Sequence, residues 1–315
     1  MGVIIIAVIA ILIILILIGL INYAAEYAFN KAFNKHKKTP EEVYEYLKKK
    51  NLYDEEIYEE IEREEVSIKS KDNLNLKGYL VEKYKNSNRF IILVHGYTAN
   101  NHTHMAFLRF FIEEGFNVLL VDERAHGESE GDYLSYGYYE KEDLDRWIEF
   151  LSKRRDGGIF LGLHGQSMGG ATVLMCGARN NKVDFIIEDC GYSDGKGIIK
   201  YQFDQINWVP FNTVYLFLKI KVWRRVKFKF KDVCPIEDIR ELKTPIMFVH
   251  GNADTYVPCG MALDMFKLRN NENDRIFLVE GADHMWAYSK KRREYERIMH
   301  EFIVNSEKIR DYGEI

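Results

Sequence analysis

Cysteine is scarce in this sequence. Its 315 residues include four cysteines, and no two of them have the C-x-x-C spacing. Disulfide frameworks and zinc sites need cysteines grouped at characteristic spacings, so neither is predicted. Cysteines without such a role are usually buried free thiols, and we expect this of all four. They are Cys176, Cys190, Cys234 and Cys259.

The sequence also lacks an excess of positive charge and the glycine-rich motifs that bind nucleotides. It has 44 basic and 48 acidic residues, whereas a nucleic-acid-binding domain is expected to be clearly basic. Neither a P-loop nor a G-x-G-x-x-G pattern occurs. The run His102-Thr103-His104 has a spacing that suits a metal, but no carboxylate stands near it. We therefore predict no nucleic-acid partner, no cofactor and no metal.

No charged residue interrupts Val3–Ile21, a run made mostly of isoleucine and leucine. A helix of this length reaches about 28 Å at ~1.5 Å per residue, close to the ~30 Å hydrocarbon core of a bilayer. A buried core helix would normally show a polar face, which this run lacks. A signal peptide cleaved at Ala24-Ala25 is an alternative, but no basic residue precedes the run and the run is long for such a signal. We predict a transmembrane anchor over residues 1–21.

Positive charge follows this span on its C-terminal side only. Four lysines stand there, whereas the N-terminal side carries only the amino group of Met1; the lysines are Lys31, Lys35, Lys37 and Lys38. Since the side richer in Lys and Arg stays in the cytoplasm, this bias predicts that residues 22–315 are cytoplasmic. Export of the domain, with the span as an uncleaved signal, is the alternative.

Residues 22–64 are expected to form a helical neck. Thr39 is the predicted N-cap, Pro40 occupies the first helical position, and Glu42 completes a capping box. From there to about Glu64 the segment is charged, with apolar residues at helix-like spacing.

From Glu65 onward, short apolar runs alternate with helix-like segments. Residues 66–70 and 74–84 alternate apolar with polar and predict an antiparallel strand pair. The runs that follow suit strands buried on both faces of a parallel sheet. They are Phe90–Val94, Val118–Val121, Ile159–Leu163, Phe185–Ile187, Ile246–Val249 and Ile276–Val279. Helix-like segments between them include Tyr138–Leu151, Ser167–Ala178 and Met261–Leu268. The pattern predicts a doubly wound α/β sheet in residues 65–315, with an insertion at about 192–243.

A nucleophile motif follows one of these runs. Gly165-Gln166-Ser167-Met168-Gly169 has the G-x-S-x-G pattern of a sharp turn from strand to helix, which exposes the serine hydroxyl. The glycines allow strand and helix to approach each other closely. A serine needs a base to activate it, and the base needs a carboxylate to orient it. Ser167 is therefore the predicted nucleophile of a Ser-His-Asp triad.

The base is sought among the histidines after Ser167, because this type of site has the chain order serine, acid, histidine. His250 ends a strand within a His-Gly pair and is more simply explained as structural. His300 falls in a charged terminal helix, whereas His284 stands in the loop after the last apolar run. His284 is the predicted base.

Three aspartates compete for the role of the acid. Asp254 follows the run Ile246–Val249, and Asp189 follows the preceding one. Asp283 is adjacent to His284 in sequence, and such neighbours rarely face each other. Asp254 is favoured, with Asp189 as its rival.

The oxyanion hole needs two backbone N–H donors. One is expected from Met168, the residue after the nucleophile, and the other from Tyr97, in the loop after Phe90–Val94.

These motifs together resemble the α/β-hydrolase superfamily. The segments that carry the resemblance are His95–Tyr97, Asp122–Gly131, Gly165–Gly170, His250–Pro258 and Gly281–His284. The chain is most similar to bacterial membrane-anchored hydrolases grouped with serine aminopeptidase-like and monoacylglycerol-lipase-like members, over about residues 65–305. The resemblance implies an α/β-hydrolase fold with a small helical cap from 192–243. It also implies hydrolysis through an acyl-enzyme, with Ser167, Asp254 and His284 as the triad.

We expect the substrate to be a carboxylic ester of small-molecule or lipid-like type. Peptidase or thioesterase activity on the same triad is the nearest alternative, and a non-catalytic membrane-anchored binding protein is the alternative from another class. Within the insertion, residues 211–231 interleave apolar and aromatic side chains with lysine and arginine. This stretch predicts a cap helix over the site, and its composition also suits contact with anionic lipid.

Overall fold

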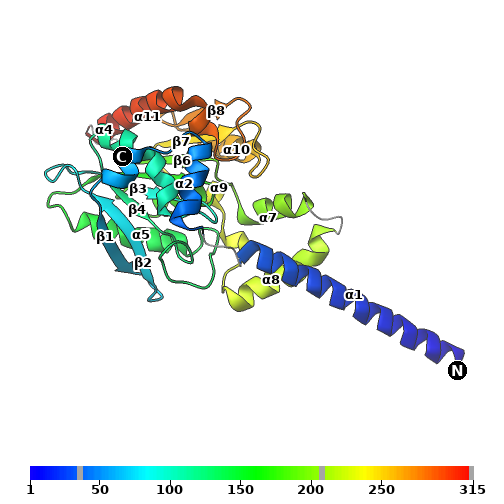
Figure 1. Cartoon of the computed structure of the whole chain (residues 1–315). Coiled ribbons are helices and arrows are strands. Elements are labelled where there is room, and N and C mark those ends of the chain that lie inside the picture. Colours follow the sequence, from blue (N-terminus) through cyan, green and yellow to red (C-terminus); the bar gives the residue numbers. More distant parts are fainter. Residues whose placement is uncertain (34–37, 206–209, 312–315) are drawn as a thin grey trace.

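An eight-stranded sheet forms the centre of the fold (Figure 1). The computed structural model describes residues 1–33, 38–205 and 210–311. The strand order is β1-β2-β4-β3-β5-β6-β7-β8. The strands are β1 (Glu64–Lys69), β2 (Asn75–Val81), β3 (Arg89–Val94), β4 (Asn117–Val121), β5 (Phe160–Gln166), β6 (Phe185–Asp189), β7 (Ile246–Gly251) and β8 (Arg275–Val279).

The pairing of the strands confirms the predicted α/β architecture. β1 pairs with β2 and β2 with β4 in antiparallel register, while β3 to β8 pair in parallel. Each of the predicted apolar runs lies in one of the parallel strands, except that Ile159 precedes the first residue of β5. The residues of β4, β5, β6 and β7 are buried throughout, because helices cover both faces of the sheet at these strands.

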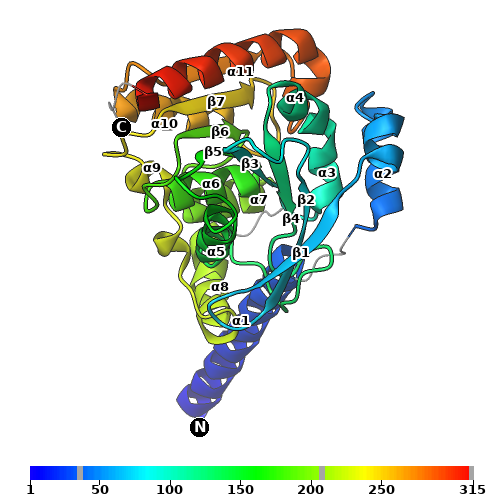
Figure 2. The same cartoon turned by 90° about the vertical axis from the view of Figure 1, so that its left-hand side faces the viewer.

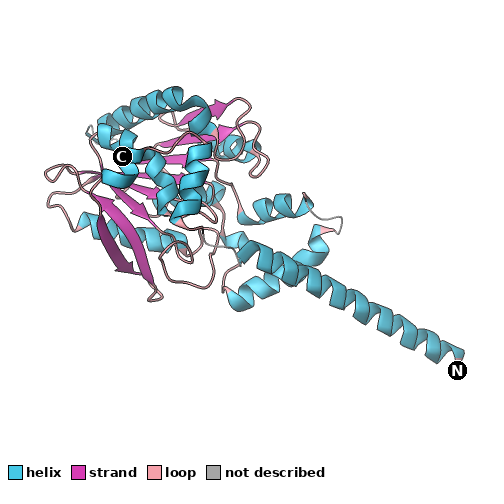
Figure 3. Ribbon diagram, viewed as in Figure 1, coloured by secondary structure: helices cyan, strands magenta, loops and turns pink. Residues whose placement is uncertain are grey.

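Helices pack on both faces of the sheet (Figures 2 and 3). One apolar layer contains side chains of η2 (Met105–Phe107), α4 (Leu108–Glu113) and α11 (Ala287–Asp311), and the short α3 (Asn101–His104) directly precedes η2. The opposite layer contains α5 (Glu140–Ser152), α6 (Met168–Gly177), α9 (Pro235–Asp238) and α10 (Cys259–Arg269). The sheet is therefore doubly wound. Because β3 to β8 run parallel, their carboxyl ends lie at one edge of the sheet.

The insertion forms a cap beside that edge. It contains α7 (Gly195–Asp204), α8 (Phe211–Arg225) and η3 (Phe230–Asp232). Its buried apolar side chains form a third cluster with Met168 and Ala171 of α6. α7 and α8 lie at the end of the body from which α1 projects (Figures 1 and 2).

The N-terminal helix α1 (Gly2–Phe33) is longer than the predicted span. It is long and apolar enough to cross a membrane, and every Val, Ile and Leu from Val3 to Leu20 is at least 44% exposed. It does not end at Ile21, because no Gly or Pro between Leu20 and Phe33 stops it. Instead its last turns pack against the cap through Ala25, Phe29 and Phe33.

The segment predicted as a neck lies against the body. Its helix α2 (Pro40–Lys49) starts at the predicted capping box of Thr39 and Glu42. A turn then leads to the short η1 (Glu56–Glu60), in place of one continuous helix. Apolar side chains of this segment are buried in the same cluster as α4 and α11; they are Val43 and Leu47 of α2, Leu52 of the turn and Ile57 of η1. Of the lysines used to predict orientation, Lys35 and Lys37 lie outside the described residues.

Candidate active site

Ser167 occupies the sharp turn between β5 and α6. Its φ of 55° and ψ of −117° are values that residues with a side chain rarely adopt. The turn is held by the Ser167 N–H, which donates to the Asp189 carbonyl at 2.8 Å. This backbone carries the Oγ to the carboxyl edge of the sheet, next to the first turn of α6.

Glycine is required on both sides of this serine. A Cβ on Gly165 would lie 2.2 Å from the Gly169 carbonyl oxygen, and a Cβ on Gly169 would lie 2.1 Å from that of Val94. Strand, helix and the neighbouring strand β3 thus approach each other more closely than any side chain would allow. The close approach that the G-x-S-x-G pattern predicted is present.

Three predicted side chains meet at this point. His284 lies in the loop between β8 and α11, and its Nε2 is 2.9 Å from the Ser167 Oγ. Its Nδ1 is 2.7 Å from Oδ2 of Asp254, which follows β7. The serine, the imidazole and the carboxylate therefore form one hydrogen-bonded chain. The Tyr256 ring lies 5.0 Å from the His284 ring and flanks it.

Asp254 is held in its charged form. Burial by itself would raise the pKa of this carboxyl, but hydrogen bonds from His250 and His284 bring the pKa well below the ordinary value. Its Oδ1 also accepts the backbone N–H groups of Tyr256 and Val257, both at 2.8 Å. The carboxylate therefore stays ionised and in a fixed orientation toward His284.

His250 contacts this carboxylate, a role that the sequence interpretation did not assign. Its Nε2 is 3.2 Å from the Asp254 Oδ2 and 3.0 Å from the Val257 carbonyl oxygen. Burial opposes the charged imidazolium, yet the hydrogen bond with Asp254 and the nearby Glu188 carboxyl raise the pKa of His250 overall. The i, i+4 spacing of His250 and Asp254 was visible in the sequence, but nothing in it indicates that the strand end turns back on itself.

The two rival acids point elsewhere. Asp189 is fully buried, and its Oδ2 accepts from Gln166 at 2.8 Å and from the Tyr295 hydroxyl at 3.2 Å. The Asp283 Oδ1 accepts from the backbone N–H groups of Thr255 and His284. Neither carboxylate has a hydrogen bond to the His284 ring.

The loop after β3 passes directly over the serine. A Cβ on Gly96 would lie 3.0 Å from the Ser167 Cβ and 3.6 Å from its Oγ. Tyr97 follows in this loop, and Met168 is the first residue of α6. The two residues predicted to supply the oxyanion hole are therefore the sequence neighbours of Gly96 and Ser167, and the positive end of the α6 dipole favours negative charge at this point.

A cavity of about 290 Å³ opens above Ser167 and Met168. Part of its wall comes from α7 and α8, through Ile198, Ile199, Phe203 and Leu218. Another part is contributed by α1, which the sequence interpretation treated only as an anchor and neck. The α1 residues are Tyr23, Ala24, Tyr27, Ala28, Lys31 and Ala32. Among the described residues that line the cavity, Lys31 is the one with a charged side chain.

Comparison with known proteins agrees with this architecture. Residues 101–308, more than half of the chain, match the prolyl oligopeptidase family. The chain belongs to this family. Together with the fold, this membership makes the protein a serine hydrolase of the α/β-hydrolase superfamily.

Relatives of this hydrolase are distant in sequence. It is 29% identical to the Bacillus subtilis protein YqkD over 256 residues, which cover 79% of this chain and 82% of YqkD. A solved esterase of Pyrococcus furiosus aligns with a TM-score of 0.64 at 20% identity, covering 86% of this chain and 95% of the esterase. Est1E of Butyrivibrio proteoclasticus aligns with a TM-score of 0.61 at 17% identity, covering 76% and 98% of the two chains. These similarities establish the shared fold.

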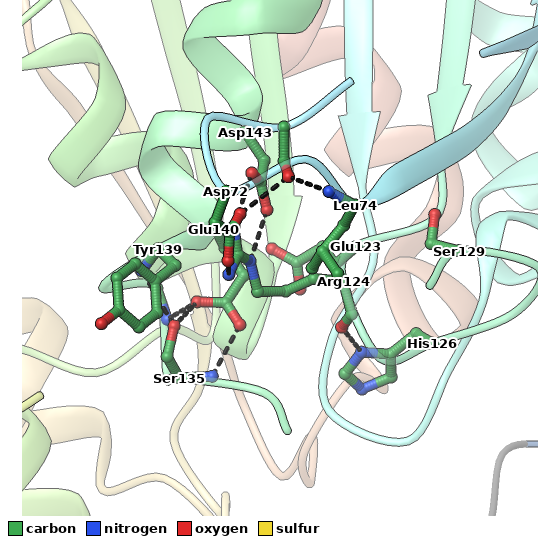
Figure 4. Close-up of polar contacts among 12 residues, drawn as sticks. Asp72, Leu74, Glu123, Arg124, His126, Ser129, Ser135, Tyr139, Glu140 and Asp143 are labelled. Atoms are coloured by element: carbon green, nitrogen blue, oxygen red, sulfur yellow. Dashed lines mark hydrogen bonds and ion pairs between the residues drawn. The ribbon is translucent and has the colours of Figure 1, made fainter. Parts of the chain in front are cut away.

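A buried polar cluster braces the loop of residues 122–139 of the hydrolase (Figure 4). Arg124 donates to Asp143 at 2.6 and 2.8 Å and to Asp72 at 3.0 Å. Burial raises the pKa of Asp143 to about 6 even though Arg124 opposes this shift. Glu123 is fully buried, and burial together with the nearby Glu140 raises its pKa well above the ordinary value. These contacts hold the loop in place beside the candidate site.

The same cluster fixes a strained residue of the cavity wall. Tyr136 has a φ of 56°, which is unfavourable for an aromatic residue. The Glu140 carboxylate accepts the backbone N–H groups on either side of it, Ser135 at 2.7 Å and Gly137 at 2.9 Å. The Tyr136 ring is thereby held in the wall of the cavity.

Lys50, at the end of α2, reaches the loop of the candidate base. Its ammonium donates to the Met285 carbonyl at 2.7 Å and lies 4.5 Å from the Trp286 ring. Burial lowers the pKa of Lys50 to about 8. A segment predicted to lie outside the catalytic domain therefore supports His284 from behind, and no sequence signal pointed to this contact.

Potential metal ligands are engaged in other contacts. His102 is 3.1 Å from the Tyr44 hydroxyl, whereas the His104 ring packs against Phe107 and His164, so the two do not share a site. Cys190 lies near Asp254 and His284, which hydrogen-bond each other. The expectation that all four cysteines are buried is wrong for Cys234 and Cys259, which are half-buried, although all four are free.

Proposed function

We propose that this hydrolase cleaves carboxylic esters through an acyl-enzyme intermediate formed on Ser167. The observation that carries the proposal is the continuous hydrogen-bonded chain from Ser167 through His284 to Asp254 beneath an apolar cavity. Such a chain activates a serine hydroxyl because the base accepts its proton while the carboxylate stabilises the resulting imidazolium.

The steps follow from the positions of these atoms. The Ser167 Oγ attacks the ester carbonyl carbon, and its proton passes to the His284 Nε2. The negative charge that develops on the carbonyl oxygen is stabilised by the backbone N–H groups of Met168 and Tyr97. The tetrahedral intermediate then expels the alcohol, which takes the proton from His284. A water molecule repeats the sequence on the acyl-enzyme and releases the acid.

The cavity favours an ester over a peptide. A peptide carries a backbone N–H and C=O at every residue, and the Ile, Phe and Leu side chains of the cap offer these groups no hydrogen-bond partners. The acyl chain of an ester has no such groups and is stabilised by burial in the same wall. Peptidase and thioesterase activity on the same triad are the alternatives.

Fluorophosphonate labelling and a substrate panel test this proposal. Purified protein is compared with the Ser167→Ala variant, using p-nitrophenyl esters, peptide p-nitroanilides and an acyl thioester. We expect labelling and ester hydrolysis by the native protein, and loss of both in the variant. Faster turnover of the anilides than of the esters would identify a peptidase. No labelling and no turnover would identify a non-catalytic binding protein.

We also propose that α1 anchors the protein in a membrane, with the catalytic domain in the cytoplasm. The unbroken exposure of its apolar residues supports an anchor. The Ala24-Ala25 bond lies within a continuous helix and Ala25 is buried, which disfavours cleavage there. The lysines after the span support the orientation.

Protease accessibility tests this orientation. Protease added to intact cells should leave the domain uncut, and digestion only after permeabilisation is the expected result. Digestion in intact cells would reverse the orientation.

A further inference from the structure

The helix that carries the apolar span also forms a wall of the cavity. Ala24, Ala28 and Ala32 recur at intervals of four residues, so they lie along one face of α1, and all three line the cavity together with Ser167. Each is half-buried. Their small side chains leave an open strip along the helix, about 12 Å long at ~1.5 Å per residue.

This part of α1 is fixed to the catalytic edge. The Tyr97 hydroxyl donates to the carbonyl oxygens of Lys31 and Ala32, each at 3.0 Å. The Tyr136 hydroxyl donates to the Ala32 carbonyl at 3.1 Å. Tyr97 belongs to the loop that passes over Ser167, so the end of the strip near Ala32 lies at the catalytic end of the cavity.

The cap holds α1 from the other side. Glu26 accepts from Lys221 at 2.8 Å and from Arg225 at 2.7 Å, both on α8. Phe29 and Phe33 stack on each other with centroids 4.8 Å apart and are buried in the cap cluster. α1 is therefore an integral wall of the cavity and does not merely pass beside it.

The other end of the strip approaches the apolar span. Only about 5 Å of helix separate Ala24 from Ile21. Tyr23 and Tyr27 line the cavity near this end and are 72% and 55% exposed. Tyrosine is favoured where an apolar and an aqueous environment meet, because its ring is apolar and its hydroxyl is polar.

We propose that this strip of α1 is the binding site for the acyl chain of a single-chain membrane amphiphile, which reaches Ser167 from the bilayer along the helix. The proposal rests on the ester hydrolysis proposed above. The other walls of the cavity include Ile198, Ile199, Phe203 and Leu218, which present the apolar surface that an acyl chain requires. The volume of about 290 Å³ is just below the range of roughly 300–1,000 Å³ that is usual for small-molecule sites, which suits one chain better than two.

A matched pair of substitutions tests the site. Ala28→Leu fills the strip, and Ala10→Leu makes the same change on the same helix within the exposed span. Full-length native and variant proteins are assayed in vesicles with p-nitrophenyl acetate and p-nitrophenyl dodecanoate. For Ala28→Leu we expect kcat/KM to fall at least tenfold more for the dodecanoate than for the acetate. Ala10→Leu should keep the native ratio. An unchanged ratio in a folded Ala28→Leu variant would overturn the proposal.

A binding measurement tests the acyl-chain site independently of ester hydrolysis. A photoactivatable fatty acid in vesicles is cross-linked to the Ser167→Ala protein, and the modified peptides are mapped. We expect cross-links in residues 23–32 that Ala28→Leu removes and Ala10→Leu retains. If these cross-links form but the native protein hydrolyses no ester, the proposed function fails and the chain site stands. Cross-links confined to other segments would overturn the site.

A comparison of ester supplied in the bilayer with ester supplied in solution tests where the amphiphile comes from. The same long-chain ester is supplied either within vesicles that hold the protein or as monomers to protein in empty vesicles, at equal total amount. Faster initial turnover of the ester already in the bilayer is expected. Faster turnover of the monomeric ester would show that the chain enters from water and would overturn the membrane route.

Discussion

The two sides of the cavity differ in what holds them together. On the side of the sheet, Ser167, His284 and Asp254 stand at strand ends and are fixed by short polar contacts in buried surroundings. On the side of α1 and the cap, the wall is built largely of alanine, tyrosine, isoleucine, leucine and phenylalanine, and it is fixed by apolar packing with a few polar contacts at its margins. Precise geometry is concentrated where bonds would break, while the opposite wall supplies shape and apolar surface. Substitutions on the two sides should therefore impair different properties of the enzyme.

The largest effect is expected from the acid on the sheet side. Asp254→Asn removes the charge that orients His284, and kcat should fall by about 10⁴-fold, the scale seen when the acid of such a triad is neutralised. Asp189→Asn is the matched control, because the rival aspartate is bonded to Gln166 and Tyr295. Ester hydrolysis and thermal melting are measured for both. If Asp189→Asn abolishes hydrolysis while Asp254→Asn retains it, the acid is Asp189.

A smaller effect, on stability, is expected from the buried cluster behind the sheet side. Because the folded pKa of Glu123 lies above the unfolded value of about 4.3, the folded state binds more protons and loses stability as pH rises above that value. Glu123→Gln removes this loss. The melting temperature of the variant relative to the native protein should therefore increase from pH 5 to pH 8. The exposed Glu113→Gln is the control, and identical pH profiles for native and Glu123→Gln proteins would contradict the prediction.

A smaller effect is expected from the hydrogen bonds by which Tyr97 joins the sheet side to α1. Tyr97→Phe keeps the backbone N–H that is proposed for the oxyanion hole but removes the hydroxyl bonds to the end of α1. A hydrogen bond of this kind contributes about 1 kcal/mol, so kcat/KM for a long-chain ester should fall by about five- to tenfold. Tyr84→Phe removes a comparable bond to the Ile112 carbonyl away from the cavity and should not affect hydrolysis. Equal losses in both variants would show that the effect is one of general stability.

The smallest effect is expected at the margin of the cap. Glu26→Gln breaks its pairs with Lys221 and Arg225, which are partly exposed, so the loss should be about 1 kcal/mol or less. Melting of native and variant proteins at low salt and at 1 M salt measures it. The melting temperatures of the two proteins should converge at high salt, because salt screens the same ion-pair attraction that the substitution removes. A difference that persists at high salt would point to packing of the Glu26 side chain instead.

The sheet side could be predicted from the sequence because its signals are local. A run such as Phe90–Val94 forms a buried strand wherever helices cover the sheet, and the glycines around Ser167 are required by contacts within the same turn. Parallel strands then bring their carboxyl ends to one edge, so Ser167, Asp254 and His284 were expected near one another without any knowledge of long-range packing.

The cap side could not be predicted in the same way. Ala24, Ala28 and Ala32 follow the apolar span with no change of helical character, so the sequence does not show that one half of the helix is exposed and the other is a wall. The contact of Lys50 with the Met285 carbonyl joins residues 235 positions apart, and that of His250 with Asp254 depends on how a strand end turns. These contacts arise from tertiary packing alone.

The continuity of α1 has a consequence for how the rate would depend on concentration. If the outer half of this helix is held in a bilayer, the cavity cannot leave the surface, and its encounters with an amphiphile become a search in two dimensions. The turnover rate would then follow the mole fraction of the amphiphile in the membrane and not its amount per volume of solution. Adding inert lipid at constant total substrate would slow the enzyme by dilution within the surface, as an inhibitor would in water.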